Sequence, residues 1–308
     1  MNILHMKYAL EVAKSGSINK AAEVLLMNQP NLSRAIRELE TSLGVQLFSR
    51  SAKGMVVTPE GEIFLHYAEK ILKQVDKVEN MFRSSLADKK RFSISVPRAG
   101  YIGEAFAEFS KKINDIGNVE IYYKETNSKR TLKNLLEEDY KLGIIRYAEG
   151  FDNYYKTLFE EKGLVAELVT EFSYELTFSE NSPLVALDKI KLSDLSHLTE
   201  IAHADPYVPS LPFAEVKREE LTDNVSRRIF VFERASQLEL LSKNSETFMW
   251  VSPIPEDTLK MYGLICRKCL ENKKVYKDVI VHHKDYRLSR LDCAFIEELC
   301  QAKRRLFS

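Results

Sequence analysis

Apolar residues return at helical spacing three times within the first 58 residues, and turn residues separate the three runs. The three apolar faces consist of Met6, Leu10 and Ala13, then Ile18, Ala21, Ala22 and Leu25, then Leu32, Ile36, Leu39 and Leu43. Gly16 ends the first helix, Ser17 caps the second, and Gly44 ends the third. The pattern predicts three short helices, followed by a two-stranded wing with strands at 45–48 and 55–58.

The third helix carries hydrogen-bond donors on the side opposite to its apolar stripe. Arg34 and Arg37 lie nearly opposite the apolar positions, Ser33 lies on the flank, and Gln29 projects from the first turn. Arginine can pair with guanine, glutamine with adenine, and serine with a base or a phosphate. The layout indicates a helix-turn-helix that reads DNA, although an ordinary solvated helix face would show the same pattern.

The predicted wing adds two basic residues near its tip. Arg50 and Lys53 could reach phosphates or a minor groove from that position. The wing therefore favours DNA binding over a solvated helix face.

A long helix follows the wing, beginning at Thr58-Pro59-Glu60 and running to about residue 86. Its apolar residues form a heptad seam of Phe64, Ala68, Ile71, Val75, Val78 and Phe82. A core helix inside one domain could show the same stripe. A solitary helix between two globular parts has nothing local to pack on, so the seam predicts pairing with a second chain and a two-fold-related DNA site.

From residue 92 onward the pattern alternates between strands and helices, which predicts an α/β region with mainly parallel sheets. Strands are expected at 92–97, 119–125, 141–146, 174–180, 198–203, 227–233, 247–253, 263–269 and 275–283, the 247–253 strand placing Trp250 in the core. Helices are expected at 101–112, 128–138, 212–221, 234–242, 255–261 and 289–306. The length of this region allows two lobes with a cleft between them.

The chain resembles the LysR-type transcriptional regulators of bacteria. The resemblance rests on VAKSGSINKAAEVL, NQPNLSRAIRELETSLGVQLFSR and VTPEG, in an ungapped match from residue 6 to residue 58. It implies a winged helix-turn-helix at 1–58, a dimerising linker helix at 59–87, and an effector-binding region at 92–308 like a periplasmic binding protein. Lobe I would span about 92–162 and 267–308, and lobe II about 163–266. The working form would be a dimer of dimers.

The resemblance also implies particular contact residues. DNA contacts would fall on Gln29, Pro30, Ser33, Arg34, Arg50 and Lys53. Effector contacts would fall on Gly100 and Tyr101 after the first strand, Asn127 and Ser128 after the second, and Ile201 and His203 across the cleft. Arg98, Arg146 and Arg234 could supply charge for an anionic ligand, although each is also explained as a surface or structural arginine. Ala9 and Ile18 stand where the family commonly has Phe.

The charge of the chain limits how it can bind DNA. The net charge is zero, and residues 1–90 hold 13 Lys and Arg against 10 Asp and Glu. Binding must therefore rest on local placement and not on bulk charge. No apolar run is long enough to span a membrane, and Lys7, Glu11 and Lys14 interrupt any secretory signal. A cytoplasmic protein with reduced thiols is expected.

The cysteines and histidines near the C-terminal end do not have the arrangement of a metal site. Cys266 and Cys269 precede His282-His283, but adjacent histidines on a strand point to opposite faces, so a zinc site is not expected. The cysteines, including Cys293 and Cys300, are interpreted as buried, inert thiols. Common nucleophile, phosphate-loop and metalloprotease motifs are absent. Neither an enzyme nor a cofactor is expected.

The sequence thus predicts a DNA-binding transcriptional regulator gated by a small molecule between two α/β lobes. Its partners would be double-stranded DNA, further copies of the chain, a small effector that could be anionic, and as a further option RNA polymerase. The main alternative is a small-molecule sensor whose N-terminal helices only mediate protein pairing. A solute-capturing transport protein is disfavoured because no export signal is seen.

Overall fold

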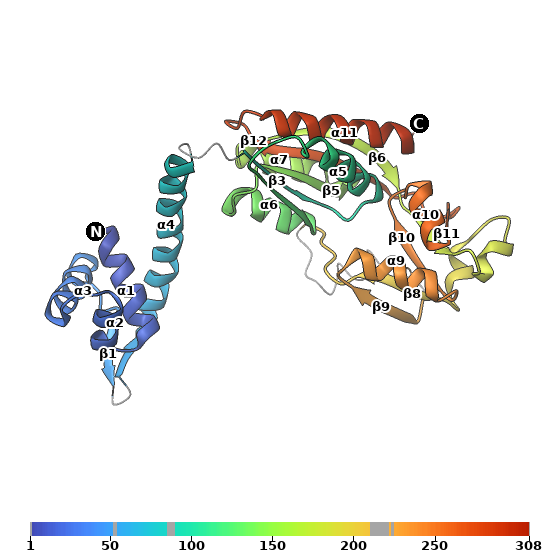
Figure 1. Ribbon diagram of the computed structural model, residues 1–308. Helices are drawn as coiled ribbons and strands as arrows, with labels where there is room; N and C mark the ends of the chain where they lie inside the picture. The colour runs from blue at the N-terminus through green and yellow to red at the C-terminus, as the bar shows by residue number, and fades with distance from the viewer. Residues whose placement is uncertain (1, 52–53, 85–89, 210–221, 223–224, 308) are drawn as a thin grey trace. The chain divides into compact units, whose positions relative to one another are not determined.

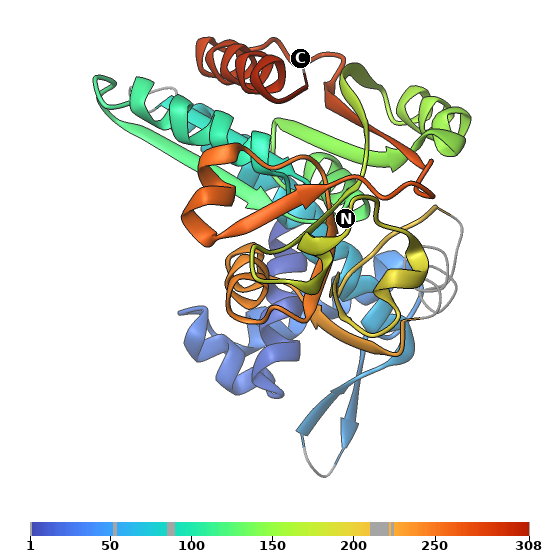
Figure 2. The ribbon, with the colours of Figure 1, turned by 90° about the vertical axis from the view of Figure 1, so that its right-hand side faces the viewer.

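The computed structural model describes residues 2–51, 54–84, 90–209, 222 and 225–307 (Figure 1). It divides the chain into two compact units, Met1–Asp88 and Lys89–Ser308. The elements of the first unit are α1 (Ile3–Ser15), α2 (Ile18–Val24), α3 (Gln29–Leu43), β1 (Phe48–Ser51), β2 (Gly54–Val57) and α4 (Pro59–Ser84). β1 and β2 pair as an antiparallel ribbon that extends beyond the three helices, as Figure 2 shows in light blue.

The three short helices form because the predicted apolar faces meet. Ala9 and Val12 of α1 pack with Leu32, Ile36 and Leu39 of α3 in one buried cluster. Gly16 and Gly44 end α1 and α3 in the left-handed conformation, as their positions predict. Such a core holds α3 by one side only, and its polar side faces outward.

The wing begins later than the sequence predicts. Its first strand starts at Phe48 and not at residue 45, because the preceding segment closes the core. Leu47 is fully buried, and its N–H and that of Phe48 both donate to Glu40 Oε1, at 2.8 and 3.1 Å. The end of α3 therefore fixes the point at which the wing starts.

The long helix α4 is not solitary over its first half. Ala68 and Leu72 are buried against Met6 of α1, and Phe64 packs on the same cluster. The prediction that the whole heptad seam is free for a partner chain is wrong, because α1 supplies the local surface that the sequence pattern does not show. Exposed apolar side chains lie on an adjacent stripe made of Ile63, Tyr67, Ile71 and Val78. Val75 is half-buried, and the side chain of Phe82 lies outside the described residues.

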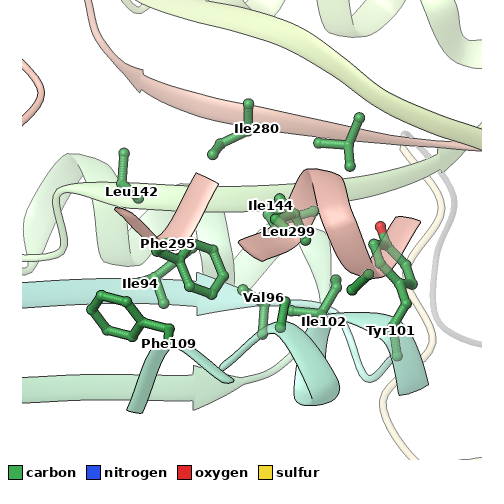
Figure 3. Packing of buried hydrophobic residues seen from close by; sticks show 14 of the residues in the cluster. Ile94, Val96, Tyr101, Ile102, Phe109, Leu142, Ile144, Ile280, Phe295 and Leu299 are labelled. Atoms are coloured by element: carbon green, nitrogen blue, oxygen red, sulfur yellow. The ribbon is translucent and has the colours of Figure 1, made fainter. Parts of the chain in front are cut away.

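The first sheet of the second unit consists of β3 (Lys90–Val96), β4 (Val119–Glu125), β5 (Leu142–Ala148), β6 (Leu164–Ser173) and β12 (Val275–His283), in the order β4-β3-β5-β12-β6. Helices α5 (Gly100–Lys112) and α11 (Arg290–Phe307) cover one face, where Phe109, Phe295 and Leu299 pack on Ile94 and Ile144 (Figure 3). Helices α6 (Ser128–Glu137) and α7 (Asp152–Glu161) cover the other face.

The second sheet consists of β7 (Glu175–Ser179), β8 (Thr199–His203), β9 (Arg227–Val231), β10 (Thr247–Val251) and β11 (Leu264–Arg267), in the order β11-β7-β10-β8-β9. Helices α9 (Arg234–Lys243) and α10 (Glu256–Tyr262) pack on it. The helix predicted at 212–221 lies outside the described residues.

Two predictions about this unit are wrong. The sheets are mixed and not mainly parallel, because β12 returns antiparallel between β5 and β6, and β7 lies antiparallel between β10 and β11. The lobe boundary near 162 is also displaced. Residues 164–173 form β6 and pair with β12, so the chain enters the second lobe at Tyr174 and returns between β11 and β12. Half of the positions of β6 are exposed, four of them in a row, and this run hid the strand from the sequence pattern.

Candidate functional site

The outward side of α3 presents the predicted donors. Arg34 is exposed and makes no hydrogen bond or ion pair with any described residue, and Pro30 is exposed in the first turn. Arg37 folds back on Ser33, with its Nε donating to the Ser33 carbonyl and its Nη2 to the hydroxyl, both at 3.3 Å. Gln29 is half-buried. The structure therefore gathers these five side chains on one helix and leaves Arg34 free to bind.

The wing is tied to the end of α1. The Met55 N–H donates to the Gly16 carbonyl at 2.9 Å, and Gly54 has a φ of +115°. A Cβ at residue 54 would lie 2.7 Å from the same carbonyl oxygen, so the turn requires glycine. Arg50 lies in β1, but its side chain and the whole of Lys53 lie outside the described residues.

The turn between α2 and α3 contains a strained residue. Leu26 has a φ of +52°, in a region that branched and bulky side chains rarely adopt, and its side chain is 94% exposed. The Met27 N–H closes the turn by donating to the Ala22 carbonyl at 3.0 Å. This turn sets the entry of the chain into α3.

A cavity of about 320 Å³ lies between the two lobes of the second unit. Six of the nine predicted effector residues line it, namely Arg98, Asn127, Ser128, Arg146, Ile201 and His203. Gly100 and Arg234 line a smaller, adjacent pocket of about 30 Å³. Gly100 allows the lobes to approach, because a Cβ there would lie 2.6 Å from Pro255 Cδ.

Tyr101 lines neither pocket, and its position is a correction to the predicted ligand contacts. Its side chain is fully buried, and its hydroxyl donates to Asp278 Oδ2 at 2.6 Å. Burial, and then the charge of Asp278, raises the pKa of Tyr101 well above its ordinary value, so the hydroxyl keeps its proton. Tyr101 therefore holds a carboxylate of the first lobe in place.

That carboxylate binds Arg146 in a two-pronged ion pair. The Nε of Arg146 donates to Asp278 Oδ1 at 2.8 Å, and its Nη2 donates to Oδ2 at 2.7 Å. The guanidinium also lies 4.7 Å from the centre of the Phe172 ring. The Ser128 hydroxyl donates to the Arg146 backbone carbonyl at 2.5 Å. These contacts hold the guanidinium of Arg146 at the cleft, while Asp278 of the first lobe neutralises its charge.

A second ion pair joins the lobes across the cleft. Arg98 Nη1 lies 3.0 Å from Oδ1 of Asp205, which follows β8 in the second lobe. Asn127 Nδ2 donates to the Asp205 backbone carbonyl at 3.0 Å, while its Oδ1 caps α6 by accepting from Arg130 N–H. Arg234 lies 3.8 Å from Glu125. All three arginines predicted to bind an anion therefore face a carboxylate of the protein itself.

The sequence pattern missed several lining residues. Trp250 packs on the core cluster of the second sheet, as predicted, but it also lines the cavity, and its Nε1 donates to Thr222 Oγ1 at 2.7 Å. Glu200, almost fully buried, accepts from the same hydroxyl and from Arg228 Nε at 2.8 Å. Asp205 could have been found from its place directly after a predicted strand, where loops of an α/β sheet bind ligands.

His203 is neutral in this cleft. Burial, and then the charges of Arg98 and Arg146, lowers the pKa of His203 to about 3. Its Nδ1 lies 2.9 Å from Gln237 Nε2. At neutral pH the ring acts as a hydrogen-bonding group and not as a cation.

The cysteines lie apart from both sites. Burial, and then Glu175, raises the pKa of the Cys266 thiol to about 12, so it stays protonated. Cys293 is exposed, which corrects the prediction that all four are buried. In the part of the chain that the structure describes, no cluster of three metal-ligating side chains occurs. No described helix has the length and apolarity needed to cross a membrane.

Residues 3–62 match the family model of the bacterial regulatory helix-turn-helix protein, lysR family. The regulator BenM of Acinetobacter baylyi is 37% identical over 103 residues, which are 33% of this chain and 32% of that protein. The N-terminal domain is therefore a helix-turn-helix of the lysR type. The regulator AlsR of Bacillus subtilis is 24% identical over 270 residues, covering 86% of this chain and 83% of that protein.

The fold of the full chain agrees with this assignment. The crystal structure of CbnR, a LysR family transcriptional regulator, matches with a TM-score of 0.55 at 17% identity, covering 98% of this chain and 99% of that one. Full-length CbnR complexed with its target DNA matches with a TM-score of 0.57. The predicted architecture of winged helix-turn-helix, long helix and two-lobed α/β region is confirmed.

Proposed function

We propose that this LysR-type protein is a sequence-specific, DNA-binding transcriptional regulator controlled by a small molecule that binds between its two lobes. The observation that carries the proposal is the outward side of α3, where Arg34 is exposed and has no partner among the described residues. The CbnR structure with its target DNA supports the same use of the domain. Such a protein acts on DNA, so we place it in the cytoplasm.

Specificity would come from α3 in the major groove. The buried side of the helix is anchored by Leu32, Ile36 and Leu39, so the outward side chains are held on a rigid element. Arg34 could fork onto a guanine, while Gln29 and Ser33 lie close enough along the helix to contact neighbouring bases or phosphates. Arg50 and Lys53 would add backbone contacts from the wing.

Control would come from the cleft of the second unit. Its cavity of about 320 Å³ has the size of small-molecule sites. A molecule bound there would change DNA binding only by as much as its affinities for two lobe arrangements differ. Whether transcription rises or falls then depends on where the operator lies.

Pairing of chains would present two DNA-reading helices. The exposed apolar stripe of α4, made of Ile63, Tyr67, Ile71 and Val78, is the surface we assign to this pairing. A pair of such pairs would give the tetramer.

Capture of genomic DNA fragments by the purified protein, followed by sequencing, tests the proposal and yields the operator. Replacing Arg34 by Ala should then weaken operator binding by about 1–3 kcal/mol, because one base-reading side chain is lost. Fluorescence anisotropy with a labelled operator measures the change. Lys156→Ala, which removes an exposed basic side chain of α7, is the control.

An unchanged operator affinity in Arg34→Ala would contradict the role given to this residue. Failure to enrich any fragment over random DNA would favour the alternative, a small-molecule sensor whose N-terminal helices serve only for pairing. The relatives that match the chain are regulators and not enzymes.

A further inference from the structure

A carboxylate of the protein itself, that of Asp205, already binds an arginine in the cleft. Arg98 Nη1 lies 3.0 Å from Asp205 Oδ1, and Asn127 Nδ2 lies 3.4 Å from Oδ2. The two side chains of the ion pair are only 11% and 12% exposed. Asp205 belongs to the second lobe, and its two partners belong to the first. The contact is therefore an internal ligand bound across the cleft.

The second arginine of the described lining and one of its glutamates are also paired with an opposite charge. The cationic side chains are Arg98, Arg146 and Lys274, and the anionic side chains are Glu200, Asp205 and Glu271. Arg146 is bound from behind by Asp278, and Glu200 is bound by Arg228. Each of the two lining arginines, Arg98 and Arg146, therefore already faces a carboxylate, and an anion that binds to either guanidinium would have to displace it.

We propose that Asp205 occupies the anion subsite of the cleft, and that the cleft therefore takes an uncharged, flat molecule with hydrogen-bonding groups. A tethered carboxylate competes with free anions at an effective concentration on the order of millimolar or higher. The rings that line the cavity suit a flat molecule; they belong to Tyr147, Phe151, Tyr174, Tyr207, Trp250 and Tyr276. The neutral imidazole of His203 adds a polar group without charge.

Only the claim that this bound molecule controls DNA binding rests on the function proposed above. The occupied subsite is a property of the second unit and is measurable without DNA. The two ideas therefore succeed or fail in separate assays.

The first experiment removes the internal carboxylate and supplies acetate in its place. In Asp205→Ala, acetate should raise the thermal unfolding midpoint by about 2–4 °C relative to chloride at equal ionic strength, because it restores a partner to Arg98. The wild-type chain should show no such rise. The double variant R98A/D205A should also show none, and Asp257→Ala, an exposed position on α10, is the control for a lost surface charge.

The second experiment compares two flat probes that differ in charge, benzoate and benzamide, by calorimetric titration. Asp205→Ala should bind benzoate about tenfold more tightly than the wild type does, while the affinity for benzamide should change little. Asp205→Asn, which keeps the shape of the side chain, should show the same preference if Asp205→Ala proves unstable.

The proposal is overturned if wild-type protein binds benzoate as tightly as the variants do, or if neither variant gains affinity for an anion. Operator binding by a chain that fails this test would leave the regulator function intact. If the Asp205 variants gain affinity for anions but the chain binds no operator, the occupied subsite is retained and its role in regulating DNA binding is rejected.

Discussion

Tyr101 and Asp205 show that the role of a single residue at the cleft depends on the direction of its side chain. Tyr101 is the second residue of α5. Its side chain turns toward the sheet, where Asp278 lies, so it positions an arginine and does not line the cavity. Asp205 shows the opposite. The sequence did not single it out, but its side chain reaches across the cleft from the loop after β8 and binds Arg98. Each role depends on which way one side chain points, and the residue type alone does not determine that direction.

Because His203 is neutral in the folded protein, the free energy of unfolding depends on pH. The pKa of His203 is about 3 in the folded protein and 6.5 in the unfolded chain, so below pH 6.5 the unfolded chain takes up a proton that the folded protein does not. Stability is thus fully present above pH 6.5 and falls as the pH drops. Between pH 6 and pH 4, wild type should lose up to about 1.4 kcal/mol per pH unit more than His203→Gln.

Urea unfolding of the two proteins at several pH values measures this difference. The exposed residue His197 supplies the control, since His197→Gln should keep the wild-type slope. Equal slopes for wild type and His203→Gln would show that His203 takes up its proton in the folded protein.

At the scale of elements, α4 shows how one amphipathic helix serves two surfaces. Its apolar residues cover more than one face, and α1 takes the part that includes Ala68 and Leu72. The stripe left exposed includes Tyr67 and Ile71. A heptad pattern reports that a helix is buried, but not which partner buries it, so the sequence could predict the helix and not the rotation of its free face.

Acidic substitutions on the exposed stripe should separate the paired chains. The double variant Y67E/I71E should raise the dissociation constant of the pair on the order of a hundredfold, because two carboxylates would be buried at the interface without partners. Sedimentation equilibrium measures the constant. Lys73→Glu places a charge on the opposite side of α4 and should leave the assembly unchanged. If this control variant dissociates and Y67E/I71E does not, the interface does not lie on the exposed stripe.

For the whole molecule, the zero net charge means that the proposed DNA binding would depend on a few placed cations and on how many copies of α3 are presented at once. A symmetric pair presents every contact twice. A substitution at one position is therefore counted twice in any property that scales with the number of phosphates neutralised.

Arg37→Ala should reveal this count. If Arg37 binds phosphate in both copies of a pair, the slope of log affinity against log salt concentration should become shallower by about two units. Titrations of the operator at several salt concentrations measure the slope. Lys156→Ala, an exposed position on α7, should leave it unchanged. A change of about one unit in Arg37→Ala would indicate that only one copy of α3 engages.

The sequence by itself determined the N-terminal domain and the polar side chains on the outward side of its third helix. Helix spacing, glycine stops and the donors at 28–37 act over a few residues, so local rules suffice to place them. The order of strands and helices in the second unit was mostly readable for the same reason, although β6 and the antiparallel return of β12 were not. Only the tertiary structure decided the chemistry of the cleft. The pairs Arg98–Asp205 and Arg146–Asp278 join residues 107 and 132 positions apart, and such long-range pairing decides which charges remain available to a ligand.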